Sequence, residues 1–311
     1  MKKILITGGA GYIGSMLSTK LVELGYQVTV LDNFSFTKNS LSHLYVFKNF
    51  KLIEGDVLNK KLFKKLINQN NIIIPLAALV GAPLCEKNKK MTKELNLNSI
   101  KFLIKNLNKN HKVLYPTTNS GYGIGAKNKY CDENSELNPI SLYGRTKVDA
   151  EKEILKFKNS ICFRLATVFG FSYRMRSDLL VNNFVQTSVK KNFLLIYEPH
   201  FRRNYIHIRD VVNVFVYSIK NFNKMKSNTY NVGLSSANLT KIQLAKQIKV
   251  KVKSLKIKIS HNKKDPDQRD YFVSNKKIEK AGFKTQYKLK DGINELVTFF
   301  KISDDNFINN Y

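Results

Sequence analysis

A tyrosine and a lysine four residues apart, Tyr143 and Lys147, form the pair in this sequence best suited to proton transfer. Residues at i and i+4 of a helix lie on one face. Pro139 and Ser141 favour a helix that begins near Leu142. Tyrosine has an ordinary pKa of about 10, and a neighbouring ammonium favours the phenolate. The pair therefore predicts a tyrosine acid/base assisted by a lysine.

The same spacing also occurs by chance in solvated helices, so its meaning depends on a second motif. Near the N-terminus an apolar strand is followed by the glycine-rich run TGGAGYIG, which opens a helix. Gly8 permits a tight turn, Gly11 lets the backbone approach a pyrophosphate, and Gly14 lets the helix pack closely on the strand. The start of the helix presents free N–H groups to the phosphates. This run predicts a dinucleotide site.

An acidic residue, Asp32, ends the second predicted strand, eighteen residues after Gly14. A carboxylate there accepts hydrogen bonds from the adenosine ribose hydroxyls and repels a 2′-phosphate. The alternative is an ordinary glycine turn with an unrelated aspartate, which leaves the order of strand, turn, helix and acid unexplained. NAD is therefore the predicted cofactor, with Tyr12, Ile13 and Asn33 among its contacts.

Apolar runs alternate with amphipathic stretches through the first half of the chain, which predicts a parallel, doubly wound α/β sheet of the Rossmann type. The predicted strands are Lys3–Thr7, Gln27–Leu31, Lys51–Glu54, Asn71–Leu76, Val113–Thr117 and Ser160–Leu165. Helices are predicted to begin near Tyr12, Phe63, Asn96 and Leu142.

After Gly170 the elements become shorter, and the pattern returns to the sheet domain over Tyr205–Ile219. A helix near Lys241–Lys249, a basic strand near Leu255–Ile259 and a final helix from Asp291 follow. We therefore expect a smaller substrate lobe interleaved with the first domain. The predicted division is 1–170 with the return segment 205–222 for the NAD domain, and 171–204 with 223–311 for the lobe.

The composition excludes several classes of protein. With 311 residues, 43% hydrophobic and 24% charged, the chain can bury a large core and is not disordered. The net charge of +30 comes from lysines scattered among asparagines, without a basic arm, so no nucleic-acid partner is expected. No apolar run approaches the roughly 18 residues of a membrane span. The N-terminal apolar run is too short for a signal peptide, which predicts a cytoplasmic chain.

Two scarce residue types carry further information. Three cysteines, Cys85, Cys131 and Cys162, show neither a disulfide framework nor metal-ligand spacing, so no metal is predicted. Only eight of the 53 basic residues are arginine, whose planar fork suits phosphate better than lysine does. For Arg145 and Arg164, anion binding and internal packing remain equal alternatives. The eight are Arg145, Arg164, Arg174, Arg176, Arg202, Arg203, Arg209 and Arg269.

From Lys3 to about Phe283 the chain resembles the extended short-chain dehydrogenase/reductases, in particular the NAD-dependent nucleotide-sugar epimerase/dehydratase family. The resemblance implies a homodimer formed through two helices, one of them the Tyr143 helix. It also implies further cofactor contacts after the third and fourth strands and at an asparagine beside the cofactor. These are Asp56, Val57, Leu76, Ala77, Ala78 and Asn96.

In the run YPTTNSGYG after the fifth strand, Thr118 matches the family's catalytic Ser/Thr, or Thr117 does if the loop register differs by one. The hydroxyl is expected to hold the reacting sugar oxygen while Tyr143 takes the proton. Family 4,6-dehydratases resemble this loop but carry Asp-Glu after the threonine. Here Asn119 and Ser120 stand there as expected sugar contacts, and neither is a general acid, so dehydration is disfavoured.

The second half resembles the family's substrate-binding segments. Thr167 lies in the segment that leads into the lobe, Asn183 and Arg203 match diphosphate contacts, and Arg269 matches an arginine that closes over the nucleotide. His207, in the same run as Arg203, is interpreted as a buried structural histidine.

The loops that include Val80, Asn119 and Arg203 resemble bacterial GDP-manno-heptose 4-dehydrogenases of capsule-sugar biosynthesis. This likeness implies oxidation of the C4 hydroxyl of a nucleoside-diphosphate sugar, with a GDP-sugar as the favoured partner. A 4-epimerase is the alternative enzyme, and a nucleotide-binding scaffold or RNA-associated protein is the non-enzyme alternative. Cys85 is either an acid/base in the sugar pocket or a small apolar filler.

Overall fold

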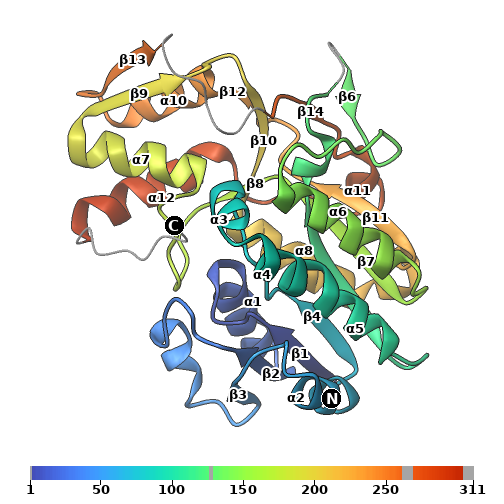
Figure 1. Ribbon diagram of the computed structural model, residues 1–311. Coiled ribbons are helices and arrows are strands. Elements are labelled where there is room, and N and C mark those ends of the chain that lie inside the picture. The colour runs from blue at the N-terminus through green and yellow to red at the C-terminus, as the bar shows by residue number, and fades with distance from the viewer. Residues whose placement is uncertain (1, 126–128, 261–268, 304–311) are drawn as a thin grey trace.

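The computed structural model describes residues 2–125, 129–260 and 269–303. Its centre is a seven-stranded parallel sheet of order β11-β7-β5-β4-β1-β2-β3 (Figure 1). This arrangement confirms the predicted doubly wound α/β class. The strands are β1 (Lys3–Thr7), β2 (Gln27–Asp32), β3 (Phe50–Glu54), β4 (Ile72–Pro75), β5 (Lys112–Thr118), β7 (Ser160–Leu165) and β11 (Asn228–Val232).

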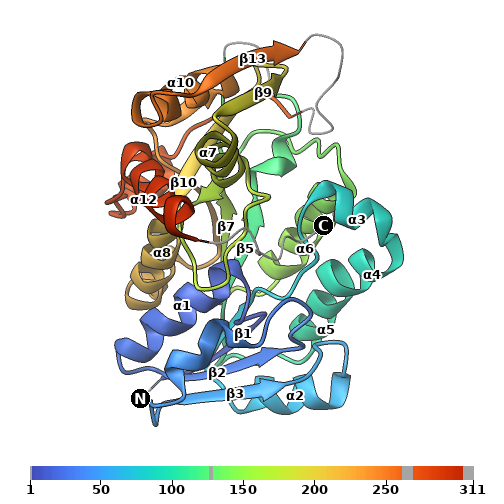
Figure 2. The ribbon, with the colours of Figure 1, turned by 90° about the vertical axis from the view of Figure 1, so that its left-hand side faces the viewer.

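Helices cover both faces of this sheet, and Figure 2 shows the two layers on either side of β1–β3. On one face α1 (Tyr12–Glu23) packs against α8 (Ile208–Lys220). On the other, α5 (Ser99–Lys105) lies between α2 (Lys60–Asn68) and α6 (Leu142–Leu155). Because both faces are buried, the central strands are apolar throughout rather than alternating. Strand β1 has four consecutive buried residues, and all of β4 is buried.

The sheet order reverses at β1, which pairs with β2 on one side and β4 on the other. In open parallel sheets, ligands bind beyond the carboxyl ends of the strands at such a reversal, since the connecting loops diverge there. The glycine-rich loop after β1 and the loop after β4 both leave the sheet at this place. The fold therefore puts a cleft where the sequence predicts the cofactor.

A second group of elements lies beyond the carboxyl ends of the strands, at the top of Figure 1. It has three small sheets, of order β12-β10-β8, β13-β9 and β14-β6, and an apolar core built largely from three helices. The strands are β6 (Tyr130–Cys131), β8 (Thr167–Phe169), β9 (Phe193–Tyr197), β10 (Arg202–His207), β12 (Asn238–Thr240), β13 (Lys256–Ser260) and β14 (Phe272–Val273). The helices are α7 (Leu180–Lys191), α10 (Lys241–Lys251) and α12 (Leu289–Ile302), with the short α9 (Phe222–Met225) and α11 (Lys276–Lys280) nearer the main sheet.

Strand β11 corrects the predicted division of the chain. Residues 223–311 were assigned to the lobe, yet Asn228–Val232 forms the edge of the main sheet beside β7. Its polar residues Thr229 and Asn231 can be buried because their side chains donate hydrogen bonds to Glu151 and to the Ser274 carbonyl, which lie far away in sequence. A strand with buried polar side chains lacks the apolar pattern by which the other six strands were predicted.

Helix starts also differ from the predictions. The α2 helix begins at Lys60 because Asn59 accepts a hydrogen bond from the Leu62 N–H and caps it. Before Asn96 the chain is already helical, through α3 (Ala82–Lys87), α4 (Lys89–Lys93) and a π-helical turn, Glu94–Asn98. The final helix begins at Leu289 rather than Asp291.

Candidate active site

The glycine-rich loop has the backbone geometry that a pyrophosphate cradle requires. Gly8 has a φ of +69°, and a Cβ added there would lie 2.6 Å from the Ala77 nitrogen. At Gly14 an added Cβ would lie 2.3 Å from the Gly8 carbonyl oxygen, so helix α1 could not sit so close to the strand. Gly11 is the N-cap of α1 and offers no side-chain acceptor, which leaves the first N–H groups of the helix for a phosphate.

Asp32 at the end of β2 is oriented by the loop it faces. Its two carboxylate oxygens accept hydrogen bonds from the backbone N–H of Ala10, at 2.8 Å, and of Phe34, at 2.9 Å. Burial raises the pKa of Asp32 above its ordinary value, and these two N–H groups oppose the rise. The carboxylate has lone pairs left for ribose hydroxyls, which fits the adenosine end of NAD.

One cavity runs from the glycine-rich loop to the Tyr143 helix. Val80 lies on its wall, although the sequence placed that residue at the sugar. Every predicted cofactor contact lines it except Asn96: Gly8, Gly11, Tyr12, Ile13, Gly14, Asp32, Asn33, Asp56, Val57, Leu76, Ala77, Ala78, Tyr143 and Lys147. Further lining residues, none of them predicted as a cofactor contact, include Ser35, Phe36, Thr37, Thr117, Arg174 and Arg176.

Asn96 supports the cavity wall instead of lining it. Its side chain forms two hydrogen bonds with the backbone of Leu79, both 2.9 Å long, one accepted from the N–H and one donated to the carbonyl. Asn96 lies in the π-helical turn, a deviation that often marks functional sites. It thus fixes the loop after β4 against helix α6, whose Thr146 it also contacts at 3.5 Å.

Helix α6 places the acid/base pair on the wall of this cavity. Ser141 caps the helix by accepting a hydrogen bond from the Gly144 N–H at 3.1 Å, so the helix begins where the sequence predicts. Tyr143 and Lys147 both line the cavity. Lys147 is 5% exposed, and its ammonium lies 4.0 Å from the centre of the Tyr115 ring, on β5. Lys147 therefore sits between the helix and the strand that carries the catalytic loop.

Thr118, at the end of β5, faces the same pair. Its hydroxyl forms a hydrogen bond to the Ser120 hydroxyl at 2.8 Å, accepts one from the Ser120 N–H, and interacts with Tyr143. Thr117 lines the cofactor cavity, and its buried hydroxyl has no hydrogen-bond partner among the described residues. The structure thus brings Thr118, rather than Thr117, to the tyrosine.

The pKa of Tyr143 moves opposite to the prediction. Burial raises it to about 12, and nearby Arg269 and Thr118 only partly oppose the rise. Burial also lowers the pKa of Lys147 to about 7, despite the opposing influence of Cys162 and Glu151. The lysine was predicted to favour the phenolate, but the low polarity of the cavity disfavours the charged form of both side chains.

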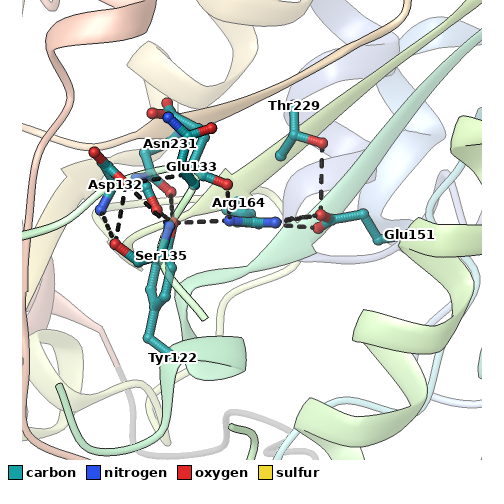
Figure 3. Close-up of polar contacts among 9 residues, drawn as sticks. Tyr122, Asp132, Glu133, Ser135, Glu151, Arg164, Thr229 and Asn231 are labelled. Atoms are coloured by element: carbon teal, nitrogen blue, oxygen red, sulfur yellow. Dashed lines mark hydrogen bonds and ion pairs between the residues drawn. The ribbon is translucent and has the colours of Figure 1, made fainter. Parts of the chain in front are cut away.

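A buried polar network supports the catalytic loop and helix from behind (Figure 3). Arg164 on β7 forms an ion pair with Glu151 of α6, with a shortest contact of 2.7 Å. It also donates to the Tyr122 hydroxyl at 3.0 Å and to the Glu133 carbonyl at 3.2 Å. The Tyr122 hydroxyl in turn donates to Asn231 of β11 at 2.7 Å. For Arg164 the structure therefore supports internal packing over anion binding.

This network connects to the acid/base pair through short stretches of chain. Glu151 lies one helical turn after Lys147, and Tyr122 ends the short 3₁₀ helix Asn119–Tyr122 that follows Thr118. Through Arg164, which bonds both Glu151 and Tyr122, the network therefore holds the loop that carries the threonine in place relative to the helix that carries the tyrosine.

Three of the predicted substrate contacts take different places in the structure. Arg269 contacts the Ser120 hydroxyl, so the C-terminal segment reaches the catalytic loop. Arg203 is buried and donates to the backbone carbonyls of Arg202 and Arg269. Asn183 is exposed on α7.

The remaining sequence candidates also take definite places. Thr167 is half-buried in β8, and both polar atoms of the buried Asn119 amide lack partners among the described residues. His207 stacks on Tyr287 with ring centres 4.8 Å apart, inside the core, which supports its structural interpretation. Burial raises the pKa of the Cys85 thiol to about 11, so it suits a filler better than an acid/base.

Two classes of feature are absent from the described ranges. Within residues 2–125, 129–260 and 269–303 no group of three or more His, Cys, Asp or Glu side chains could hold a metal ion. In the same ranges no helix combines the length and apolar character needed to cross a membrane.

The fold and the site define a class, an NAD-binding α/β enzyme with a tyrosine–lysine pair. Residues 4–233 match the NAD dependent epimerase/dehydratase family, and the chain belongs to that family. It is therefore an NAD-dependent enzyme of the extended short-chain dehydrogenase/reductase type, and several of its relatives are named as nucleotide-sugar enzymes.

Individual relatives match along nearly the whole chain. The CDP-paratose 2-epimerase of Salmonella typhi is 26% identical, over 94% of this chain and 98% of that protein. A putative UDP-glucose 4-epimerase of Methanocaldococcus jannaschii is 24% identical, over 96% and 98%. The structure of a UDP-glucuronic acid 4-epimerase from Bacillus cereus, with UDP-glucuronic acid and NAD, has a TM-score of 0.83 at 23% identity, over 96% and 99%.

Proposed function

We propose that this enzyme oxidises the C4 hydroxyl of a nucleoside-diphosphate sugar to the 4-keto sugar, with GDP-manno-heptose as the candidate substrate. One observation carries the proposal: Tyr143 and Lys147 line the cofactor cavity, and Thr118 interacts with Tyr143 from the end of β5. A protein that only bound nucleotide would need none of these three side chains.

Each of the three side chains has a role in the oxidation. Loss of a hydride from carbon accompanies loss of a proton from oxygen, and NAD, when bound, supplies the hydride acceptor. Thr118 holds the C4 oxygen, and Tyr143 takes its proton. Lys147, when protonated, offsets part of the cost of the Tyr143 phenolate, a cost that burial raises in this site.

The loop after Thr118 argues against elimination of water. Dehydration needs a proton delivered to the leaving hydroxyl at C6, and neither Asn119 nor Ser120 can donate one as a general acid. The buried amide of Asn119 has no partner among the described residues and is free to bond a sugar hydroxyl.

The nucleotide and the assembly follow from the resemblance of the substrate segments. Asn183 and Arg203 would bind the diphosphate, Arg269 would close over the nucleotide, Thr167 and Val80 would contact the sugar, and the loops favour GDP. The expected assembly is a homodimer through two helices, one of them α6, which carries Tyr143. The product would enter the biosynthesis of a surface polysaccharide, in the cytoplasm.

A 4-epimerase is the second candidate, in which the ketone is reduced again from its other face. The relatives favour it, because two of the matched proteins are named as 4-epimerases. The same three residues serve both reactions, so only the fate of the ketone separates them.

The test is mass spectrometry of the sugar after incubation with GDP-manno-heptose, and in parallel with UDP-, CDP- and dTDP-sugars. Loss of two hydrogen masses from the GDP-sugar alone is the expected result. An unchanged mass with altered stereochemistry at C4 would establish the epimerase instead. Loss of one water mass would overturn the interpretation of Asn119 and Ser120, and a different preferred nucleotide would overturn the choice of GDP.

A further inference from the structure

Residues 170–178, the segment that follows β8, are fastened to the start of helix α1. The Tyr12 hydroxyl donates to the Gly170 carbonyl at 2.7 Å, and the Ser172 hydroxyl donates to the Tyr12 carbonyl at 2.7 Å. Ser172 and Ser15 also share a hydrogen bond of 3.1 Å. The segment therefore begins beside the helix terminus that the pyrophosphate is expected to approach.

The next residues of the segment reach the loop after β2. The Arg174 guanidinium lies 4.5 Å from the centre of the Phe36 ring, and the Tyr173 ring lies 4.3 Å from the His43 ring. Phe36 and His43 follow Asp32 in the chain, so the segment connects the α1 terminus with the adenosine side of the cleft. Both Arg174 and Phe36 line the cofactor cavity.

Arg174 is a buried cation whose charge is not matched by an ion pair among the described residues. It is 3% exposed, and its Nη2 has no hydrogen-bond partner in the described part of the chain. Burial and the like charge of Arg176 lower the pKa of Arg174 to about 10, and the charges of Asp178 and Asp32 only partly oppose this fall. Arg176, two residues on, is different because it pairs with Asp178. A buried guanidinium without such a partner is unfavourable unless an anion binds it.

The chemistry of the cofactor identifies that anion. The pyrophosphate is the one anionic group of NAD, and Asp32 at the ribose repels any phosphate placed on the 2′ oxygen. Arginine binds phosphate oxygens through two parallel N–H groups, which suits the Arg174 side chain on the wall of the cavity. The N–H groups at the start of α1 would bind the opposite side of the pyrophosphate.

We propose that Arg174 binds the pyrophosphate of NAD across from the α1 terminus, so that residues 170–178 hold the cofactor in its cleft. The Phe36 ring keeps the guanidinium in place by packing against its face. This proposal concerns the cofactor alone and does not depend on which sugar the enzyme oxidises. A cofactor held from both sides would leave slowly.

The experiment measures nucleotide binding rather than turnover. Kd values for NAD, ADP and adenosine are determined by calorimetry on the full chain as wild type, Arg174→Met and Arg174→Lys, with Arg145→Gln as an exposed control. Arg174→Met is expected to weaken NAD and ADP by about 10- to 100-fold, as for a lost hydrogen bond to a charged group. Adenosine binding is expected to stay unchanged. Arg174→Lys should recover part of the loss, and Arg145→Gln should match the wild type.

Several outcomes would overturn the proposal. Equal weakening of adenosine and ADP would show that Arg174 only shapes the loop after β2. Unchanged NAD and ADP affinity would show that it binds no phosphate. If Arg174→Met does not fold, Arg174→Lys decides, because a shortened point charge should still weaken ADP and spare adenosine. A failed search for the sugar substrate leaves these binding results untouched.

Discussion

Two buried arginines, Arg164 and Arg174, lie ten residues apart in the chain and differ in what surrounds their charge. Arg164 is 6% exposed and is neutralised by Glu151, with Tyr122 and a backbone carbonyl completing its bonds. Arg174 is 3% exposed and is packed against Phe36, with Nη2 unbonded among the described residues. Both residues are arginines and both are buried to a similar degree. Only their partners distinguish the structural cation, Arg164, from the cation arranged for a ligand, Arg174.

The largest expected effect tests the structural half of this comparison. Arg164→Met leaves Glu151 buried without its partner, which should cost about 3–5 kcal/mol in the free energy of unfolding. Urea denaturation measures this loss, and it should be the same with and without NAD. The double variant Arg164→Met with Glu151→Leu should recover much of it, since no lone charge remains buried. A loss below about 1 kcal/mol in Arg164→Met, typical of exposed pairs, would show that the network is not a supporting element.

Tyr143→Phe tests the chemistry that the network supports. Turnover should fall by at least about 100-fold, the range for a lost acid/base group. Folding and NAD affinity should stay close to wild type, because the hydroxyl alone is removed. Steady-state kinetics and a NAD titration on the same preparation check both expectations. Full activity in this variant would remove Tyr143 from the mechanism.

Lys147→Met should lower turnover in the same way and should also change how stability depends on pH. Burial lowers the Lys147 pKa from its ordinary value to about 7 in the folded chain. Between about pH 7 and 10 the unfolded chain therefore binds more protons, and wild-type stability rises with pH across this window. Methionine has no such proton, so the melting temperature of the variant should exceed that of wild type most at pH 7. The difference should shrink towards pH 10, and a constant difference would contradict the low pKa.

The local motifs of the site could be predicted because each depends on neighbours in sequence. The glycine turn, Asp32 and the Tyr143–Lys147 face all lie within one strand–turn–helix unit or one helix. Arg174 was not predicted as a cofactor ligand because its segment has no periodic pattern. Its one signal was the use of arginine in a lysine-rich chain.

Contacts between distant segments account for the other differences. The pKa direction of Tyr143 depends on burial that only the assembled cavity provides. Strand β11 was missed because Thr229 and Asn231 are buried through bonds to residues far away in sequence. The hydrogen bonds from Asn96 to Leu79 likewise join a helix to a loop seventeen positions earlier, so its supporting role could not be read from either segment alone.

The smallest expected effect concerns how Asp32 and Arg174 divide the recognition of NAD between them. Asp32→Ala removes the acceptor for the ribose hydroxyls, so NAD affinity should fall by roughly tenfold, while NADP loses a repulsive neighbour and should be discriminated less. If Arg174 binds the pyrophosphate common to both nucleotides, Arg174→Met should weaken NAD and NADP equally. The NADP-to-NAD ratio of the double variant should then equal that of Asp32→Ala. Calorimetric Kd values for four proteins and two nucleotides complete this double-mutant cycle. If the double variant loses the raised NADP-to-NAD affinity ratio of Asp32→Ala, Arg174 contacts the 2′-phosphate of NADP. A residue that binds only the pyrophosphate contacts a group that both cofactors share, so it cannot change this ratio.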